Sequence, residues 1–329
     1  MAKITTITPD EMKQVITPEL LAESCQKFLS ELIQMPIQVM QDQTAKYITI
    51  IPGVRNQLSF GQLDGDAQLA PWSKTNSGDA DYNIIGRTLE VFPGNCARNF
   101  DPMPLFHSIY GDSIALGESM TKHQIARKLV ALFAAKIGMH IDEHIWDAKR
   151  NVSGKDTASL FNGFDTIIGE EIAGGGIAAG KGNYFKVGEI DETNAVEKLK
   201  EFYRSADKHL RNQQTFMYMS PDVYNAYVDD YQARHGSLPY NQSFEKDTLE
   251  GSRGKCKFAV LDNMAGSKFL KLSTKPNFLL GTDINSQENH CNVAKYSSWQ
   301  LTFEFAAVYG AQIRTLSKEA FLVGDMTTE

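Results

Sequence analysis

The stretch "TKHQIARKLVALFAAKIGMHIDEHIWDAKR", Thr121 to Arg150, decides the fold prediction. Its apolar residues recur near the 3.6-residue period of an α-helix, from Ile125 to Ile145. Roughly 30 residues at ~1.5 Å each would form a rod of about 45 Å, which is longer than most helices of globular proteins. The stretch ends in Lys149 and Arg150, and positive charges are favourable at the C-terminus of a helix. The sequence therefore predicts one long helix over residues 121–150.

The same stretch contains His140-x-x-Glu143-His144, the inverted zinc-peptidase signature. On a helix the two histidines would lie roughly 40° apart, within the apolar stripe, so both imidazoles are expected to face packed structure. A peptidase also needs a later carboxylate ligand, and Glu197 and Glu201 have no supporting motif around them. The sequence favours structural histidines and no metal site, with a zinc metallopeptidase as the alternative.

Two segments precede this helix. Residues 1–52 contain a short amphipathic helix, "TPELLAESCQKFLSELI", and then a strand-like strip beginning "MPIQVMQ", which together bury little and should lie on this subunit or on a neighbour. Residues 53–100 contain two strand-like runs, "NQLSFGQL" and "NIIGRTLEVFP", on either side of a glycine-rich polar cluster. This pattern predicts a long hairpin that is either a plain surface loop or an arm gripping a partner subunit.

The chain after the helix is mixed. Residues 151–190 are predicted to be loop-rich, and "AGGGIAAGKG" fails the phosphate-loop pattern because Gly182 stands where Ser or Thr is required. Residues 194–236 predict helix, strand and helix, with Ser220 as N-cap, Pro221 at the first position and Gly236 as the stop. The last 40 or so residues are strand-rich, so the fold class is α+β.

The composition of the chain excludes several classes of function. Among 329 residues the net charge is -7, which argues against a dedicated nucleic-acid binder but not against a protein that only encloses DNA. The four cysteines form no close pair, which indicates a reduced cytosolic chain. The first residues lack the apolar core of a secretory signal, and no apolar run approaches the ~20 residues of a membrane helix. No nucleophile motif or dinucleotide fingerprint is present, so neither a catalytic residue nor a cofactor is expected.

The order of these parts resembles the major capsid proteins of tailed bacteriophages, with the fold of the Hong Kong 97 phage. The resemblance covers most of the chain from about residue 50. The stretches "FNGFDTIIGEE", "TFMYMSPDVYNAYVDDYQARHG", "KFLKLSTKPNFLLGTDI" and "WQLTFEFAAVYGAQIRTLSKEAFLVG" are similar to successive parts of that fold. The resemblance implies five segments: an N-terminal arm (1–52), an extended E-loop hairpin (53–100), a peripheral domain with a spine helix (101–158, helix 121–150), an axial domain (159–288) and a return to the peripheral domain (289–329).

The resemblance also implies a structural protein without enzymatic activity. Copies would assemble through pentamers and hexamers into an icosahedral virion shell that encloses phage DNA, in the cytoplasm of a bacterial host. A separate scaffolding protein and a portal protein are the expected partners, and no membrane is involved. The expected subunit contacts are Trp72, Lys74, Arg87, Pro93 and Phe164. An encapsulin-like compartment shell, with the same fold around an enzyme cargo, is the alternative within this fold.

Overall fold

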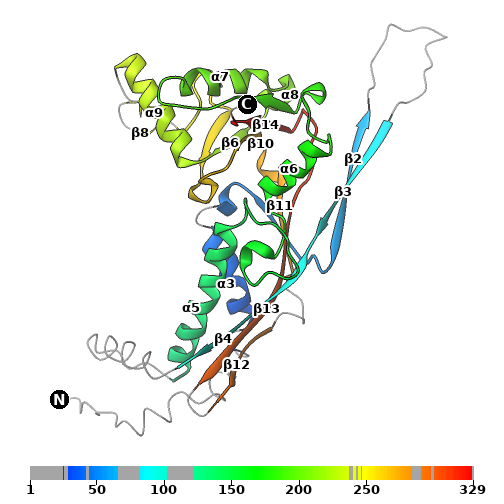
Figure 1. Ribbon diagram of the computed structural model, residues 1–329, viewed down its shortest axis with the longest axis vertical. Coiled ribbons are helices and arrows are strands. Elements are labelled where there is room, and N and C mark those ends of the chain that lie inside the picture. The colour runs from blue at the N-terminus through cyan, green and yellow to red at the C-terminus, as the bar shows by residue number, and fades with distance from the viewer. Residues whose placement is uncertain are drawn as a thin grey trace.

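The computed structural model describes residues 25, 29–41, 44–65, 82–101, 122–236, 240–241, 244–245, 247–283, 290–297 and 300–327. The subunit is elongated (Figure 1): a long sheet backed by two helices fills its lower half, and a compact lobe of strands and helices lies at its upper end. Helices and strands both contribute to this fold, as the α+β prediction requires.

The long strand β13 (Leu301–Ile313) organises the lower half. Its residues from 303 to 309 alternate between buried and partly exposed, as expected for a strand with one face on a core. Strand β4 (Phe92–Phe100) pairs antiparallel with one edge of β13, while β12 (His290–Lys295) and β11 (Phe278–Thr282) pair with the other edge. Strand β1 (Thr49–Pro52) then adds parallel to β11.

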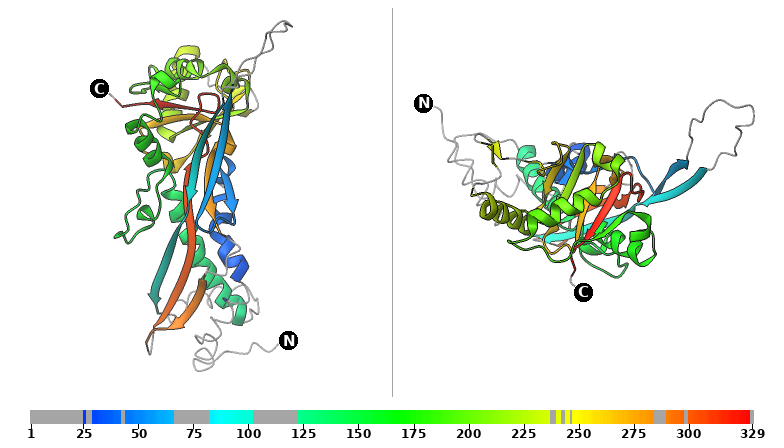
Figure 2. Two further views of the ribbon diagram at one scale, coloured as in Figure 1. Left: turned by 90° about the vertical axis from the view of Figure 1, so that its right-hand side faces the viewer. Right: turned by 90° about the horizontal axis from the view of Figure 1, so that it is seen from above.

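Helices α3 (Leu29–Gln41) and α5 (Lys122–Glu143) pack together beside this sheet (Figures 1 and 2). Gly138 lets the two backbones touch, because a Cβ there would lie 2.6 Å from Cα of Pro36. The strand-like interpretation of residues 35–41 was wrong, since they are helical, with Ile37 and Met40 buried. Tertiary burial against α5 outweighs the local signal, and this part of the arm lies on its own subunit.

The long helix ends earlier than predicted. It stops at Glu143 rather than continuing to Arg150, and residues 144–147 form turns. Ile145 and Trp146 are almost completely buried, which requires the chain to bend into the core. Backbone hydrogen bonds from Gly163 to the Ala148 carbonyl (2.8 Å) and from Lys149 to the Ala158 carbonyl (2.8 Å) fix that bend.

The compact lobe contains a second five-stranded sheet. The strand order is β5 (Tyr184–Lys186), β14 (Phe321–Asp325), β10 (Phe269–Ser273), β6 (Thr215–Met219) and β9 (Cys256–Val260). Helices α7 (Ala195–Ser205), α8 (Lys208–Asn212) and α9 (Pro221–His235) lie with it at the upper end (Figure 1), and β7 (Tyr240–Asn241) pairs with β8 (Phe244–Glu245). The predicted helix caps are confirmed: the Ser220 hydroxyl accepts from Val223 N, and Gly236 has a left-handed φ of 65°.

Helix α6 (Phe164–Ala173) was missed by the loop-rich prediction for residues 151–190. Its apolar residues Phe164, Ile167 and Ile168 are buried, and this burial stabilises the helix despite the glycines that follow it. At its first turn Asp165 forms an ion pair with Lys271, a lysine with no exposed surface whose ammonium lies 4.6 Å from the centre of the Trp146 ring. This ion pair links β10 to α6.

The two sheets do not follow the predicted boundary between the axial segment (159–288) and the peripheral return (289–329). Strand β11, expected in the axial segment, pairs with β13 in the long sheet, whereas β14, expected in the peripheral return, pairs with β10 and β5 in the compact lobe. A single boundary in the sequence therefore cannot separate the two halves of the subunit. Within the described residues, no helix is both long and apolar enough to span a bilayer.

Candidate assembly surface

The predicted hairpin is confirmed in its two strands. Strand β2 (Gln57–Gly65) pairs antiparallel with β3 (Tyr82–Glu90), with Gln57 opposite Glu90 and Gly65 opposite Tyr82. The two form a separate sheet that extends away from the body (Figures 1 and 2), and residues 57–59 are exposed. A two-stranded ribbon is marginally stable alone in water, so its orientation depends on how its base is held.

The base of the hairpin, residues 89–91, packs against two glycines of the long sheet. Gly281 on β11 and Gly310 on β13 are paired across the sheet. A Cβ on Gly281 would lie 2.8 Å from a Leu89 methyl carbon, and a Cβ on Gly310 would lie 2.0 Å from the Glu90 carbonyl oxygen. The missing side chains leave room for residues 89–91, which are the end of β3 and the single residue between β3 and β4. Leu89 and Val91 pack there with Val54 and Leu279 in a small separate core.

Arg87 adds a polar attachment to this hairpin base. Its guanidinium forms an ion pair with Glu171 of α6 (2.7 Å) and donates to the Ile313 carbonyl (2.8 Å) and to the Gln312 side chain (3.0 Å). Gln312 in turn donates to the Thr88 carbonyl at 2.8 Å. The Arg87 side chain is only 13% exposed. Arg87 was predicted to contact a neighbouring subunit, but its described contacts lie within its own chain, where they fix β3 to the body.

The other predicted contacts fall in three different settings. Trp72 and Lys74 lie outside the described residues. Pro93 is exposed on β4, which among the described strands pairs only with β13 and so has a free outer edge. Phe164 is wrong as a surface contact: its side chain is completely buried, with ring centres 5.0 Å from Trp146 and 4.9 Å from Phe278. An apolar ring that begins α6 is stabilised in the core rather than on the surface.

Helix α5 contributes a second exposed surface. Leu132 and Met139 are 51% and 50% exposed, and their spacing of seven residues places them on one face of the helix. Lys136 lies between them and is also exposed. The described part of this helix face therefore presents two apolar side chains and one cation to the surface.

The structure places His140 and His144 in two separate side-chain pairs. The His140 side chain is 59% exposed and contacts Glu143 at 3.3 Å, while His144, beyond the end of α5, contacts Asp147 at 3.1 Å. The expectation that both imidazoles face packed structure was therefore wrong for His140. Each histidine pairs with its own carboxylate, and the described residues include no cluster of three metal-ligating side chains.

The close contact of Gly281 and Gly310 with the hairpin base was not predicted, although the sequence contains a signal for it. Gly281 and Gly310 interrupt apolar strand patterns, "NFLLGTDI" and "AAVYGAQI", and a glycine inside a strand often marks the close approach of another backbone. The partners at residues 89–91 are distant in sequence and could not be identified from that signal alone.

Comparisons with known proteins agree on the fold. No protein-family model matches the sequence, and no curated protein matches it. Among solved structures, the chain resembles one from the satellite phage P4 procapsid with its size determination (Sid) protein: the TM-score is 0.54 at 7% identity, over 90% of this chain and 99% of that chain. The cyanophage A-1(L) capsid gives 0.53 at 12% identity, over 90% and 94%.

The capsid of the native GTA particle is similar to the same degree, with a TM-score of 0.50 at 10% identity, over 87% of this chain and 90% of that chain. Matches this distant in sequence identify the fold. The chain has the mixed α/β fold of Hong Kong 97-type capsid proteins over nearly its whole length.

Proposed function

We propose that this chain is the major subunit of an icosahedral virion shell and has a structural rather than a catalytic role. Its copies assemble through pentamers and hexamers. The observation that carries this proposal is the hairpin of β2 and β3, which projects from the body while its base is fixed to it. An arm that projects from the body of its own chain suits contact with a neighbouring subunit.

The base geometry supports this role. Because Gly281 and Gly310 admit residues 89–91 and Arg87 joins β3 to α6 and β13, the direction of the hairpin is set before any neighbour binds. A pre-oriented arm loses less conformational freedom on association than a free one, and a closed shell repeats each modest contact many times. The exposed face of α5 and the free edge of β4 offer further contact surfaces on the same subunit.

The proposed partners follow from this role. The shell would enclose phage DNA without sequence-specific contacts, consistent with a chain of net charge -7. A separate scaffolding protein would direct assembly, and a portal protein would occupy one vertex. The hairpin would be the E-loop of the fold, the region around α5 and β13 its peripheral domain, and the compact lobe its axial domain, all within a bacterial cytoplasm until release.

Assembly of the full chain tests the proposal. The protein is purified alone and with neighbouring genes of its source co-expressed, then studied by size-exclusion chromatography and negative-stain electron microscopy. Closed shells, tubes, or rings of five and six subunits are expected. A compact monomer at all concentrations, with or without partners, would contradict it. Particles that protect an enzyme rather than DNA from digestion would instead support the encapsulin-like alternative.

A further inference from the structure

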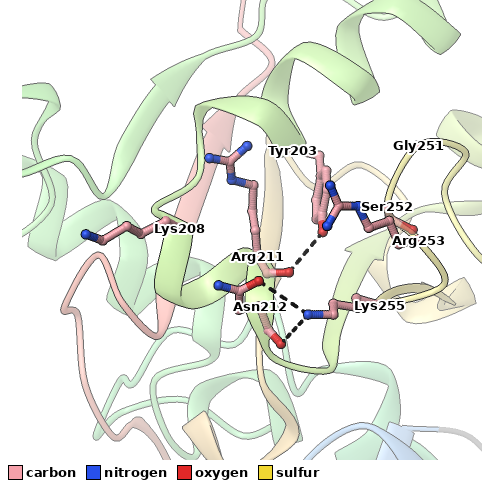
Figure 3. Close-up of a pocket in the computed structure, with 8 residues that line it drawn as sticks. All are labelled: Tyr203, Lys208, Arg211, Asn212, Gly251, Ser252, Arg253 and Lys255. Carbon is pink, nitrogen blue, oxygen red and sulfur yellow. Dashed lines mark hydrogen bonds between the residues drawn. The ribbon is translucent and has the colours of Figure 1, made fainter.

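A pocket in the compact lobe is lined by basic side chains and is not explained by shell assembly. It has a volume of about 270 Å³ and lies between the end of α7, the short helix α8 and the turn that leads into β9 (Figure 3). Four of its lining residues are cations from two separate segments: Lys208 and Arg211 on α8, and Arg253 and Lys255 in the turn. The lining includes no carboxylate.

The cations of this pocket are not paired with carboxylates of the described residues. The Nε of Arg211 is buried and has no hydrogen-bond partner. A buried donor without a protein partner is unfavourable, and an anion bound in the pocket would satisfy it. This concentration of positive charge stands out in a chain whose net charge is -7.

The turn that carries Arg253 and Lys255 has an unusual backbone conformation. Arg253 is the one non-glycine residue with positive φ (59°) in the described chain, and Gly251 and Gly254 on either side of it also have positive φ. Lys255 donates to the Asn212 carbonyl (2.9 Å) and side chain (3.3 Å), which ties the turn to α8. Non-glycine residues adopt this conformation mainly where the surroundings impose it, often at functional sites. Figure 3 shows Arg211, Arg253 and Lys255 on the two segments, with Lys255 hydrogen-bonded to Asn212 and Lys208 extending away from them.

We propose that this pocket binds a compact polyphosphate anion, of the class of inorganic triphosphate or the phosphate tail of a nucleotide. Guanidinium and ammonium groups are the preferred partners of phosphate oxygens. A bounded pocket suits a compact anion, whereas a nucleic-acid strand requires an extended basic groove. The inference concerns the compact lobe alone and does not depend on the proposed shell function.

Isothermal titration of the full-length protein with sodium triphosphate tests the inference. Saturable binding is expected at 50 mM salt, weaker at 500 mM because salt screens exposed charges. The double variant Arg211→Gln, Arg253→Gln should bind at least about tenfold more weakly, a loss of roughly 1.4 kcal/mol. The matched control is Arg204→Gln, Lys257→Gln, which removes two exposed charges of the same lobe outside the pocket and should leave affinity within about twofold.

The exposed Lys208 provides a second variant if the double variant folds poorly: Lys208→Gln should weaken binding about threefold without loss of folding. A nucleoside triphosphate that binds more tightly than inorganic triphosphate would identify a nucleotide as the source of the anion. No saturable binding by the wild type, equal loss in the pocket and control variants, or stronger binding of a single-stranded oligonucleotide at equal phosphate concentration would each overturn the inference.

Discussion

The hairpin is a single antiparallel strand pair, whereas the sheet of the compact lobe combines antiparallel and parallel pairs, and the two regions are stabilised in opposite ways. In the compact lobe a five-stranded sheet and its helices enclose a core that includes Leu199, Phe202 and Leu272, all without exposed surface. Strands β2 and β3 form only a two-stranded sheet, and the buried residues that hold it are at its base. The described residues of the lobe enclose their core within one chain, whereas the core described for the hairpin lies at its base. A change at the hairpin base should therefore impair assembly far more than an equally exposed change in the body.

Gly310→Ala should have the largest effect. The new Cβ would lie 2.0 Å from the Glu90 carbonyl oxygen, a backbone atom that cannot move without displacing the hairpin base. We expect a loss of about 3 kcal/mol in the free energy of unfolding and no assembled particles. Chemical denaturation and electron microscopy measure the two effects.

The matched control is Gly169→Ala on α6, where a Cβ would meet no atom within 4 Å. It should stabilise the protein by roughly 0.5–1 kcal/mol, since alanine favours a helix over glycine, and leave assembly intact. Similar behaviour of the two variants would show that the close approach at Gly310 has no role in holding the hairpin.

Arg87→Gln should have an intermediate effect. It removes an ion pair and leaves the Ile313 carbonyl and Glu171 without their donor, at a cost of about 2 kcal/mol. Faster amide hydrogen exchange in β3 and fewer closed particles are expected. Arg55→Gln is the control, because the Arg55 side chain is 81% exposed and lies 3.7 Å from Asp283, so its loss should cost less than about 0.5 kcal/mol. Unchanged exchange in β3 of the Arg87 variant would count against this attachment.

Asp142→Asn should have the smallest effect and act on the body alone. Asp142 is 8% exposed, and burial raises the pKa of its carboxyl above the ordinary 3.8. The folded state therefore holds more protons than the unfolded state between that value and the raised one, so Asp142 lowers stability as the pH rises through this window. The variant should be more stable than the wild type by about 1 kcal/mol at pH 7 and nearly equal to it at pH 4.

Thermal unfolding across pH 4–8 measures this difference. The control is Asp147→Asn. The Asp147 side chain is 66% exposed, so this substitution should change the free energy of unfolding little at any pH. Assembly should be unchanged in both variants. A gain that is the same at pH 4 and pH 7 would show that ionisation of Asp142 is not its cause.

Local patterns predicted the parts of the fold that depend on neighbouring residues. The hairpin strands, the helix caps at Ser220 and Gly236, and the long final strand all follow from period and turn chemistry within one stretch. The overall capsid fold followed from the order of these parts, and the structural comparisons agree with it.

The failures share a different cause, which is burial by residues far away in the chain. Helix α5 ends at Glu143 because Trp146 enters the core, and residues 35–41 are helical because they pack on α5. Arg87 looked like an exposed hairpin cation, but its partners are on α6 and β13. No periodicity within one segment reports such contacts.

The most direct test of the central claim is to shorten the hairpin and keep its base. Residues 66–81 are replaced by Asn-Gly, a two-residue turn that joins β2 to β3, and the variant is compared with the wild type by analytical ultracentrifugation and electron microscopy. The shortened variant is expected to be a folded subunit, with an unfolding midpoint within a few degrees of the wild type, that no longer forms closed shells. Normal shells from the shortened chain would contradict the claim that this hairpin joins neighbouring subunits.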